Sequence, residues 1–322
     1  MFLKGGITSM NDNLLAGIDC GATKVMVQSG VYSSTTNKIS PGPINLEFYY
    51  SDHPDWDSKF MPVPLDTQKS EYQSDNISLS YEEINQSNVI IDTIVSSIKI
   101  IEDHKIGLCY PGLKNHRGIV VMANGPRILN LTHHIHPVKS ILNDSDCCVI
   151  GELKSTIGMM QDTENGIYIG GGTGIADGII LNGEILNITN TVGVPRCWEI
   201  SVSSNETVET LLSPAGIIKR YNDQNNTDVK VLADLVPKKQ FNKIMDDALK
   251  AFLKLVEVRE RFFQSQNEEI EEIVIGQRLG EFFNDFGEKY LKRFQSSTKI
   301  PIKISSDRRT AALGAAISFA CS

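Results

Sequence analysis

The hydrophobic positions of this chain follow two periods in turn, which predicts strands and helices in succession. Residues 14–19 and 25–31 are apolar runs on either side of a glycine-containing turn, an arrangement typical of a β-hairpin. Residues 81–102 then carry isoleucine and valine at helical spacing, and they lead into an apolar strand at 105–110 that ends at a Pro-Gly pair. A long helix followed by a buried strand indicates the α/β class.

The same reasoning predicts elements along the rest of the chain. Further strands are expected at 45–50, 118–123, 147–150, 166–170, 177–182, 272–276 and 300–304. Further helices are expected at 207–222, 237–263, 279–294 and from 310 to the C-terminus. Residues 33–80 are rich in Ser, Asn, Asp, Thr and Pro, so most of this region is expected to be loop.

A strand, a glycine-rich turn and a second strand occur near the N-terminus and again in mid-chain, which indicates an internal duplication. We therefore predict a first domain from 14–152 together with a C-terminal helix at 308–322, and a second domain at 153–307. Residues 1–13 are expected to be disordered.

The composition of the chain argues against several classes of function. The chain has 322 residues, of which 41% are hydrophobic, and this is enough for two domain cores. Its net charge of −8 argues against a general nucleic-acid or anionic membrane surface as partner. No apolar run approaches the ~20 residues needed to span a bilayer. The six cysteines show no CxxC spacing and no signal peptide is evident, which favours reduced thiols in the cytoplasm.

The two glycine-rich turns are the strongest candidates for chemistry. Glycines let the backbone approach a ligand with its N–H groups exposed, so two such turns predict two contacts with one phosphate chain. The first turn follows Asp19, whose carboxylate at a strand end is suited to hydrated Mg²⁺. Asp19 as a cap of the hairpin turn, and Lys24 as a solvated lysine, remain alternatives.

Several motifs recur in an order that resembles the ROK family of sugar kinases and related repressors, within the actin/hexokinase/Hsp70 nucleotide-binding superfamily. In chain order they are Asp19-x-Gly21-Ala22-Thr23-Lys24, Tyr110-Pro111-Gly112-Leu113, Ala123-Asn124, Gly170-Gly171-Gly172-Thr173-Gly174 and Ala311-Ala312-Leu313-Gly314-Ala315-Ala316. The resemblance implies two actin-like ATPase domains with a nucleotide cleft between them. It also implies ATP and Mg²⁺ as cofactors, a hexose or N-acetylhexosamine as substrate, and a homodimer.

The resemblance also implies roles for particular residues. Asp19 would hold the metal through water. The phosphate and nucleotide contacts would come from Gly21, Thr23, Lys24, Gly171, Gly172, Thr173, Gly174, Gly276 and Gln277. The sugar contacts would come from Asn124, Glu209 and Glu199, the last in place of the glutamate of the family's Gly-Glu-x-Gly-His motif.

The expected catalytic base is Glu152. In the family this group is the Asp of an Asn-Asp-x-Asn segment at the end of a strand and the start of a helix, and Glu152 stands where that Asp is expected. Gly151 and Lys154 replace the two asparagines.

Metal centres other than the Mg²⁺ site are not predicted. Cys197 is the only cysteine between Cys148 and Cys321, which excludes the family's usual structural zinc site of three Cys and one His on ligand count. Three histidines at positions 133, 134 and 136 are interpreted as facing solvent or lining a cleft.

Other functions stay open. The altered segment at Glu152 motivates a sugar- or nucleotide-binding protein with weak or lost kinase activity. The family's repressors carry an N-terminal helix-turn-helix, for which a first strand at about residue 14 leaves no room. An ATPase that activates a partner enzyme would often carry an iron–sulfur cluster, and the scattered cysteines do not support one.

Overall fold

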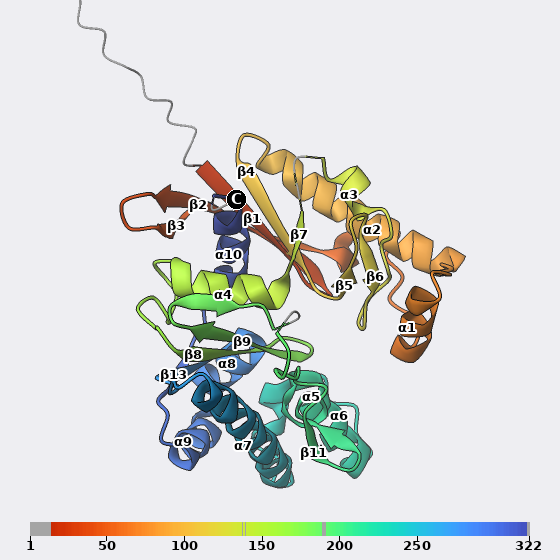
Figure 1. The fold of residues 1–322 in the computed structure, drawn as a ribbon. Helices are drawn as coiled ribbons and strands as arrows, with labels where there is room; N and C mark the ends of the chain where they lie inside the picture. Colours follow the sequence, from red (N-terminus) through yellow and green to blue (C-terminus); the bar gives the residue numbers. More distant parts are fainter. Residues whose placement is uncertain (1–13, 137, 139, 189–190, 321–322) are drawn as a thin grey trace, which may run out of the picture. The chain divides into compact units, whose positions relative to one another are not determined.

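The computed structural model describes residues 14–136, 138, 140–188 and 191–320. The chain divides into two compact units (Figure 1). Unit 1 runs to Ile157 and takes up the chain again at Arg309, whereas unit 2 is Gly158–Arg308. The expectation for residues 1–13 lies outside the described residues.

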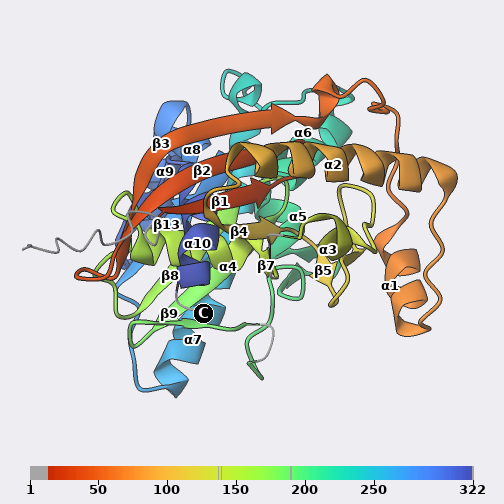
Figure 2. The same ribbon diagram turned by 90° about the horizontal axis from the view of Figure 1, so that it is seen from above.

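Unit 1 is built on a five-stranded sheet with the order β3-β2-β1-β4-β7. Its strands are β1 (Leu14–Cys20), β2 (Lys24–Ser33), β3 (Lys38–Tyr49), β4 (Lys105–Tyr110) and β7 (Ile141–Asn143). The first three strands pair antiparallel and lie side by side in Figure 2, while β4 and β7 run parallel to β1. Each carboxyl end of these parallel strands therefore faces the same edge of the sheet.

Helices cover both faces of this sheet. The helix α2 (Tyr81–Ile100) packs on the face that carries Ile18 and Leu108. The helices α4 (Asp144–Lys154) and α10 (Arg309–Ala320) pack together and share the other face. Side chains alternate along a strand, so Asp19 lies on the same face of the sheet as these two helices.

Glycines allow α10 to lie directly on the sheet. A Cβ atom at Gly17 would stand 1.6 Å from the carbonyl oxygen of Ala312, and one at Gly107 would stand 1.8 Å from that of Ala315. A Cβ at Gly314, on α10 itself, would stand 1.8 Å from the carbonyl oxygen of Cys147 in α4. Close packing of backbones therefore requires glycine at Gly17 and Gly107 in the sheet and at Gly314 in α10.

The region 33–80, predicted to be mostly loop, contains defined elements. The strand expected at 45–50 belongs to the longer β3, and it is followed by a 3-10 turn η2 (Tyr50–Asp52) and the helix α1 (Leu65–Gln73). Unit 1 also contains the hairpin β5 (Leu113–Lys114) and β6 (Ile119–Val121), and a short helix α3 (Leu131–His134). The hydrophobic pattern of the sequence does not indicate these elements, because polar side chains hold them through buried hydrogen bonds.

The strand predicted at 147–150 is wrong, since these residues form the middle of α4. Four consecutive apolar residues do not distinguish a strand from a buried helix. The helical signal lies just before them, where Asp144 and Asp146 occupy the first turn and their negative charges favour the helix N-terminus.

Unit 2 repeats the architecture of unit 1, which confirms the internal duplication. Its sheet has the order β10-β9-β8-β13-β14. The strands are β8 (Gly166–Gly171), β9 (Ile175–Leu181), β10 (Glu184–Leu186), β13 (Glu272–Gly276) and β14 (Ile302–Ile304). The first three pair antiparallel, and β13 and β14 run parallel to β8, as in unit 1.

The helices of unit 2 enclose its large apolar core. They are α5 (Val208–Leu212), α6 (Pro214–Asn225), the 3-10 turn η3 (Leu232–Leu235), α7 (Phe241–Ser265), α8 (Gln277–Asp285) and α9 (Glu288–Ser297). A small hairpin joins β11 (Ser201–Ser203) to β12 (Glu206–Thr207). The helix predicted at 207–222 is divided at Ser213-Pro214, where proline starts a new helix, and the one predicted at 279–294 is divided at Gly287.

Among the described residues, none of the helices combines the length and the apolar character that crossing a bilayer would require.

Candidate functional site

Acidic side chains gather at the carboxyl ends of the parallel strands of unit 1. Asp19 is the second-last residue of β1 and pairs in register with Cys109 of β4. Asn143 ends β7, and Asp144 follows as the first residue of α4. In open α/β sheets, ligands bind outside the carboxyl ends of the strands. This edge of the sheet is therefore the candidate transfer site of unit 1.

The charges of Asp19 and Asp144 act on each other. The pKa of Asp19 is raised to about 6, mainly by burial and also by the nearby Asp144 carboxylate, while a hydrogen bond from Cys109 and the charge of Lys24 oppose this rise. The Cys109 Sγ lies 3.4 Å from Asp19 Oδ1. Burial also raises the pKa of Asp144. A cation near these two carboxylates would favour their ionised forms, which burial disfavours.

The carboxylate of Asp19 fits Mg²⁺ in the form that such sites usually take. Mg²⁺ keeps several waters and binds through one or two carboxylates together with substrate phosphates. Within the described ranges, no group of three or more His, Cys, Asp or Glu side chains forms a complete metal site. Asp19 would thus supply the protein part of an otherwise hydrated ion, with Asp144 close to that ion but not bound to it.

The start of α4 is fixed by polar contacts. Lys114 Nζ donates to Asn143 Oδ1 at 2.6 Å and to the Gly112 carbonyl at 2.8 Å. Asn143 Nδ2 lies 3.4 Å from Asp146 Oδ2. Asp144 therefore lies at the start of a helix, between Asn143 and Asp146, whose side chains are both held by polar contacts.

The expected location of Glu152 at a strand–helix junction is wrong. Glu152 lies in α4, eight residues after Asp144 and roughly 12 Å farther along the helix, and its side chain is completely buried. The junction is occupied instead by Asn143-Asp144-Ser145-Asp146, which has the Asn-Asp-x-Asn pattern with Asp as its last residue. The acidic first turn was the sequence signal that could have located this segment.

The glycine turn of unit 1 is a tight hairpin. The Gly21 N–H donates to the Lys24 carbonyl at 2.9 Å, and the Tyr50 hydroxyl donates to the Gly21 carbonyl at 3.2 Å. The Thr23 side chain is exposed. Lys24, predicted to contact phosphate, forms an ion pair with Glu47. Its ammonium therefore already has an anionic partner, while its charge still lowers the pKa of Asp19.

In unit 2, two predicted site residues flank the second glycine turn. Glu209 Oε2 accepts a hydrogen bond from the Ile175 N–H at 3.1 Å, and a Cβ at Gly174 would stand 2.7 Å from Glu209 Oε1. On the other side, a Cβ at Gly172 would stand 2.7 Å from Gln277 Oε1. The ends of the Gln277 and Glu209 side chains therefore lie directly against the backbone of the glycine turn. The structure brings Gly172, Gly174, Glu209 and Gln277 together.

The rest of this turn is held by neighbouring helices. The Thr173 carbonyl accepts a hydrogen bond from the Ala215 N–H at 3.2 Å, which ties the turn to the first residues of α6. Gly171 packs against Leu279 of α8. Gly276 caps α8, and Gln277 has a φ of +56°, in the left-handed region that favours glycine.

The predicted sugar-contact residues lie in different surroundings. Asn124 is exposed on a turn of unit 1. The turn lies between Met122, whose N–H donates to the buried Gln68, and Arg127, whose Nε donates to the buried Glu83. Glu199 of unit 2 is exposed, and its Oε2 accepts a hydrogen bond from the Arg196 N–H at 2.8 Å. Glu199 thus closes its own turn, and no contact of the described residues brings it to the glycine turn.

A buried ion pair in unit 2 was missed by sequence reasoning. Arg259 of α7 donates from Nε to Asp177 Oδ2 at 2.6 Å and from Nη2 to the Pro195 carbonyl at 2.6 Å. Cys197 Sγ lies 3.3 Å from Asp177 Oδ1, and burial raises the pKa of this thiol well above its usual range. Cys197, Asp177 and Arg259 therefore hold the segment around residue 196 together.

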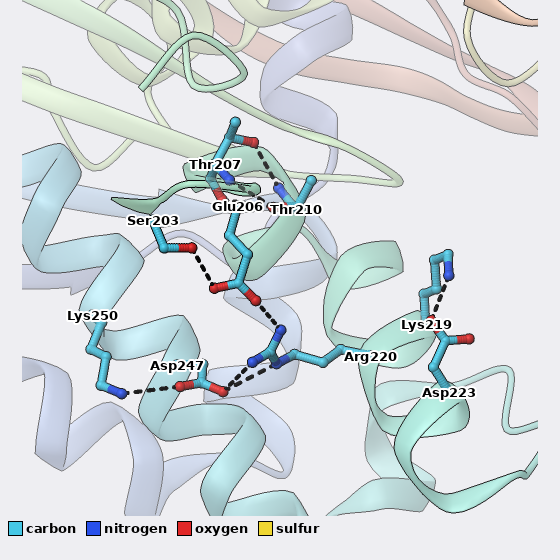
Figure 3. Close-up of polar contacts among 9 residues, drawn as sticks. All are labelled: Ser203, Glu206, Thr207, Thr210, Lys219, Arg220, Asp223, Asp247 and Lys250. Atoms are coloured by element: carbon cyan, nitrogen blue, oxygen red, sulfur yellow. Dashed lines mark hydrogen bonds and ion pairs between the residues drawn. The ribbon is translucent and has the colours of Figure 1, made fainter. Parts of the chain in front are cut away.

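A second arginine holds the end of the same segment. Figure 3 shows Arg220 of α6 between Glu206 of β12 and Asp247 of α7. Arg220 Nη2 lies 2.8 Å from Asp247 Oδ2, and Lys250 Nζ lies 3.1 Å from Asp247 Oδ1. Thr207 and Thr210 form a reciprocal capping box at the start of α5. These contacts fix the short helix that carries Glu209.

Comparison with solved structures identifies the fold. A ROK-family glucokinase from Streptomyces griseus, solved with glucose and AMPPNP, is similar with a TM-score of 0.54 at 17% identity, over 94% of this chain and 98% of that chain. A protein from Listeria monocytogenes, described as a candidate N-acetylmannosamine kinase, is similar with a TM-score of 0.60 at 15% identity, over 96% of this chain and 99% of that chain.

A ROK-family transcriptional regulator, a homologue of the Escherichia coli MLC protein, is similar with a TM-score of 0.58 at 14% identity, over 96% of this chain and 78% of that chain. No family model matches the chain, and no curated protein matches it in sequence. The chain therefore has the actin-like ATPase architecture, as predicted. More particularly, its fold is that of the ROK sugar kinases and their regulatory relatives.

Proposed function

We propose that this protein phosphorylates a hydroxyl group of a hexose or N-acetylhexosamine, with ATP and Mg²⁺. The observation that carries the proposal is the position of Asp144, at the start of a helix and beside Asp19, at the carboxyl ends of the parallel strands. Solved structures of the same fold include sugar kinases, one of them holding glucose and AMPPNP.

In this proposal Asp144, and not Glu152, is the catalytic base. Its carboxylate accepts the proton of the sugar hydroxyl as that oxygen bonds to the γ-phosphorus of ATP and the bond to the leaving ADP oxygen breaks. A pKa raised by burial strengthens Asp144 as a proton acceptor. Bound Mg²⁺ would neutralise charge on the phosphates. Asn143 would orient the sugar beside the base.

The two glycine turns serve the nucleotide. Gly21 and Thr23 of unit 1 would contact phosphate oxygens, and the turn at Gly171–Gly174 would do so in unit 2. Gln277, beside Gly172, would contact the nucleotide from the start of α8. Lys24 would reach phosphate only by exchanging its contact with Glu47.

The proposed sugar contacts are Asn124, Glu209 and Glu199. Asn124 is exposed and its turn is held from both ends, which suits a ligand contact. Glu209 lies at the glycine turn, so we propose that it acts at the junction of sugar and phosphate sites. Glu199 is assigned only through the resemblance, as is the homodimer.

A sugar-binding protein without turnover is the second candidate, since a transcriptional regulator shares this fold. A panel of hexoses and N-acetylhexosamines, incubated with the full chain, ATP and Mg²⁺, distinguishes the two. Phosphorus NMR would detect ADP and a sugar phosphate in equal amounts with at least one sugar if the proposal is correct. Binding of a sugar by calorimetry, with no sugar phosphate formed from any member of the panel, would support the second candidate.

A further inference from the structure

Lys114 is a lysine that the predicted catalytic set does not include, and it lies at the candidate transfer site of unit 1. It ends β5, and its side chain is partly buried. The ammonium donates to the Gly112 carbonyl at 2.8 Å and to Asn143 Oδ1 at 2.6 Å. Lys114 therefore connects the loop that follows β4 to the residue that precedes Asp144.

The connection joins a glycine turn to a strand of the sheet. Gly112 has a φ of +89°, and a Cβ there would stand 2.4 Å from the Val121 carbonyl oxygen, so this position of the loop requires glycine. Asn143 is the last residue of β7, in register with Tyr110 of β4. The ammonium thus joins the loop that follows β4 to the end of a paired strand of the sheet.

The charges around Lys114 explain why a cation is retained in this place. Its charge acts on Asp144 and Asp146, whose carboxylates lie in the first turn of α4. Burial opposes the charged form of Lys114 and lowers its pKa, while these neighbours oppose that change. Without the ammonium, adjacent carboxylates of one helical turn would repel each other.

The bond to Lys114 also sets the direction of the Asn143 amide. Because Oδ1 accepts from the ammonium, Nδ2 is left to donate, and it points to the side of Asp146. An amide without this partner can rotate by about 180° and present its oxygen instead. A sugar hydroxyl oxygen needs the donor.

We propose that Lys114 is a positioning residue of the transfer site, which holds the Asn143 amide and the start of α4 in the arrangement that receives the sugar hydroxyl. The inference rests on the proposed function, because it assigns Asn143 and Asp144 to the sugar. Lys114 acts through these residues and is not itself a catalytic residue.

Three variants test this inference. Lys114→Met removes the charge and both hydrogen bonds, Lys114→Arg keeps a cation with donors, and Lys99→Met removes an exposed lysine of α2 as the matched control. We expect Lys114→Met to lower kcat/KM for the sugar by about 10- to 100-fold, as for a displacement of catalytic groups by about 1 Å. Lys114→Arg should recover most of this loss, and Lys99→Met should match the wild type.

Nucleotide binding separates positioning from general damage. The Kd of a nonhydrolysable ATP analogue for Lys114→Met should stay close to wild type, because neither of the two glycine turns is altered by the substitution. The inference is overturned if kcat/KM of Lys114→Met stays within about twofold of wild type, or if sugar and nucleotide binding weaken together, or if Lys114→Arg recovers nothing.

A readout without turnover keeps this test independent of the proposed function. The side-chain amide signals of Asn143, assigned with Asn143→Ser in ¹⁵N-labelled protein, should move in Lys114→Met and stay in place in Lys99→Met. Unmoved signals in Lys114→Met would overturn the inference. If the wild-type chain phosphorylates no sugar while these signals move as expected, the proposed function fails and the contact of Lys114 with Asn143 stands.

Discussion

Arg127 and Glu83 form a completely buried ion pair, and its removal should destabilise unit 1 strongly. The exposed fractions of the two residues are 0% and 1%. Arg127 Nε lies 2.9 Å from Glu83 Oε1, and Nη2 lies 2.8 Å from Oε2. Arg127→Met leaves the Glu83 carboxylate buried without a cation, which should cost about 3–5 kcal/mol of unfolding free energy.

A double-mutant cycle tests the cause of that loss. Glu83→Gln alone leaves Arg127 with its ion pair to Glu71 and its bond to the Ser78 carbonyl, so its cost should be smaller. The double variant, Arg127→Met with Glu83→Gln, contains no unpaired buried charge. We expect it to be more stable than Arg127→Met, with a coupling energy of about 1–3 kcal/mol.

The two tryptophans of the chain make the assay specific to a unit. Trp56 lies in unit 1, stacked with Tyr50 at a ring-centroid distance of 5.8 Å, whereas Trp198 lies in unit 2. In a Trp198→Phe background, urea unfolding followed by fluorescence reports on unit 1 alone. A loss below about 1 kcal/mol in Arg127→Met, or the absence of coupling in the cycle, would refute the reasoning.

Further predictions concern packing and charge. Gly107→Ala places a Cβ against the Ala315 backbone, so it should cost at least about 3 kcal/mol in urea unfolding, whereas the control Gly125→Ala, with its nearest neighbour atom 3.6 Å away, should stay within about 1 kcal/mol. A Gly107→Ala chain as stable as wild type would contradict the direct contact of α10 with the sheet. In EDTA, Asp19→Asn should be more stable than wild type at pH 8, because the folded-state pKa of Asp19, about 6, exceeds the ordinary aspartate value of 3.8. The folded state then binds more protons between these values, so wild-type stability falls as pH rises from about 4 to 6, by up to about 3 kcal/mol. Thermal unfolding from pH 4 to 8 checks this, and a Tm gap between variant and wild type that narrows toward pH 8 would contradict it.

The fold could be predicted from the sequence because its strongest signals are local. The strand–glycine turn–strand units and the helix before β4 are visible in the hydrophobic period, and the order of motifs added the architecture. The predicted positions of elements became wrong where the elements are short. β7 has three residues, so the apolar run at 147–150 was taken for the strand, and Glu152 for its end.

Other parts of the site depend on contacts between distant residues. Nothing local in the sequence indicates that Lys114 reaches Asn143, or that Arg127 pairs with Glu83 over an interval of 44 residues. The role of Gly172 was anticipated as ligand contact. The structure adds a neighbour that the sequence does not indicate, since the end of the Gln277 side chain lies against Gly172.

The central claim is that Asp144, at the start of α4, is the base of a sugar kinase. Its most direct test compares kcat for Asp144→Asn and Glu152→Gln, with the best sugar of the panel and with both variants confirmed as folded by circular dichroism. The account predicts that Asp144→Asn lowers kcat by about 10²- to 10⁴-fold with little change in the Kd of the ATP analogue, while Glu152→Gln keeps kcat within about threefold of wild type. A folded Asp144→Asn that retains wild-type kcat, or a folded Glu152→Gln that loses it, would contradict the account.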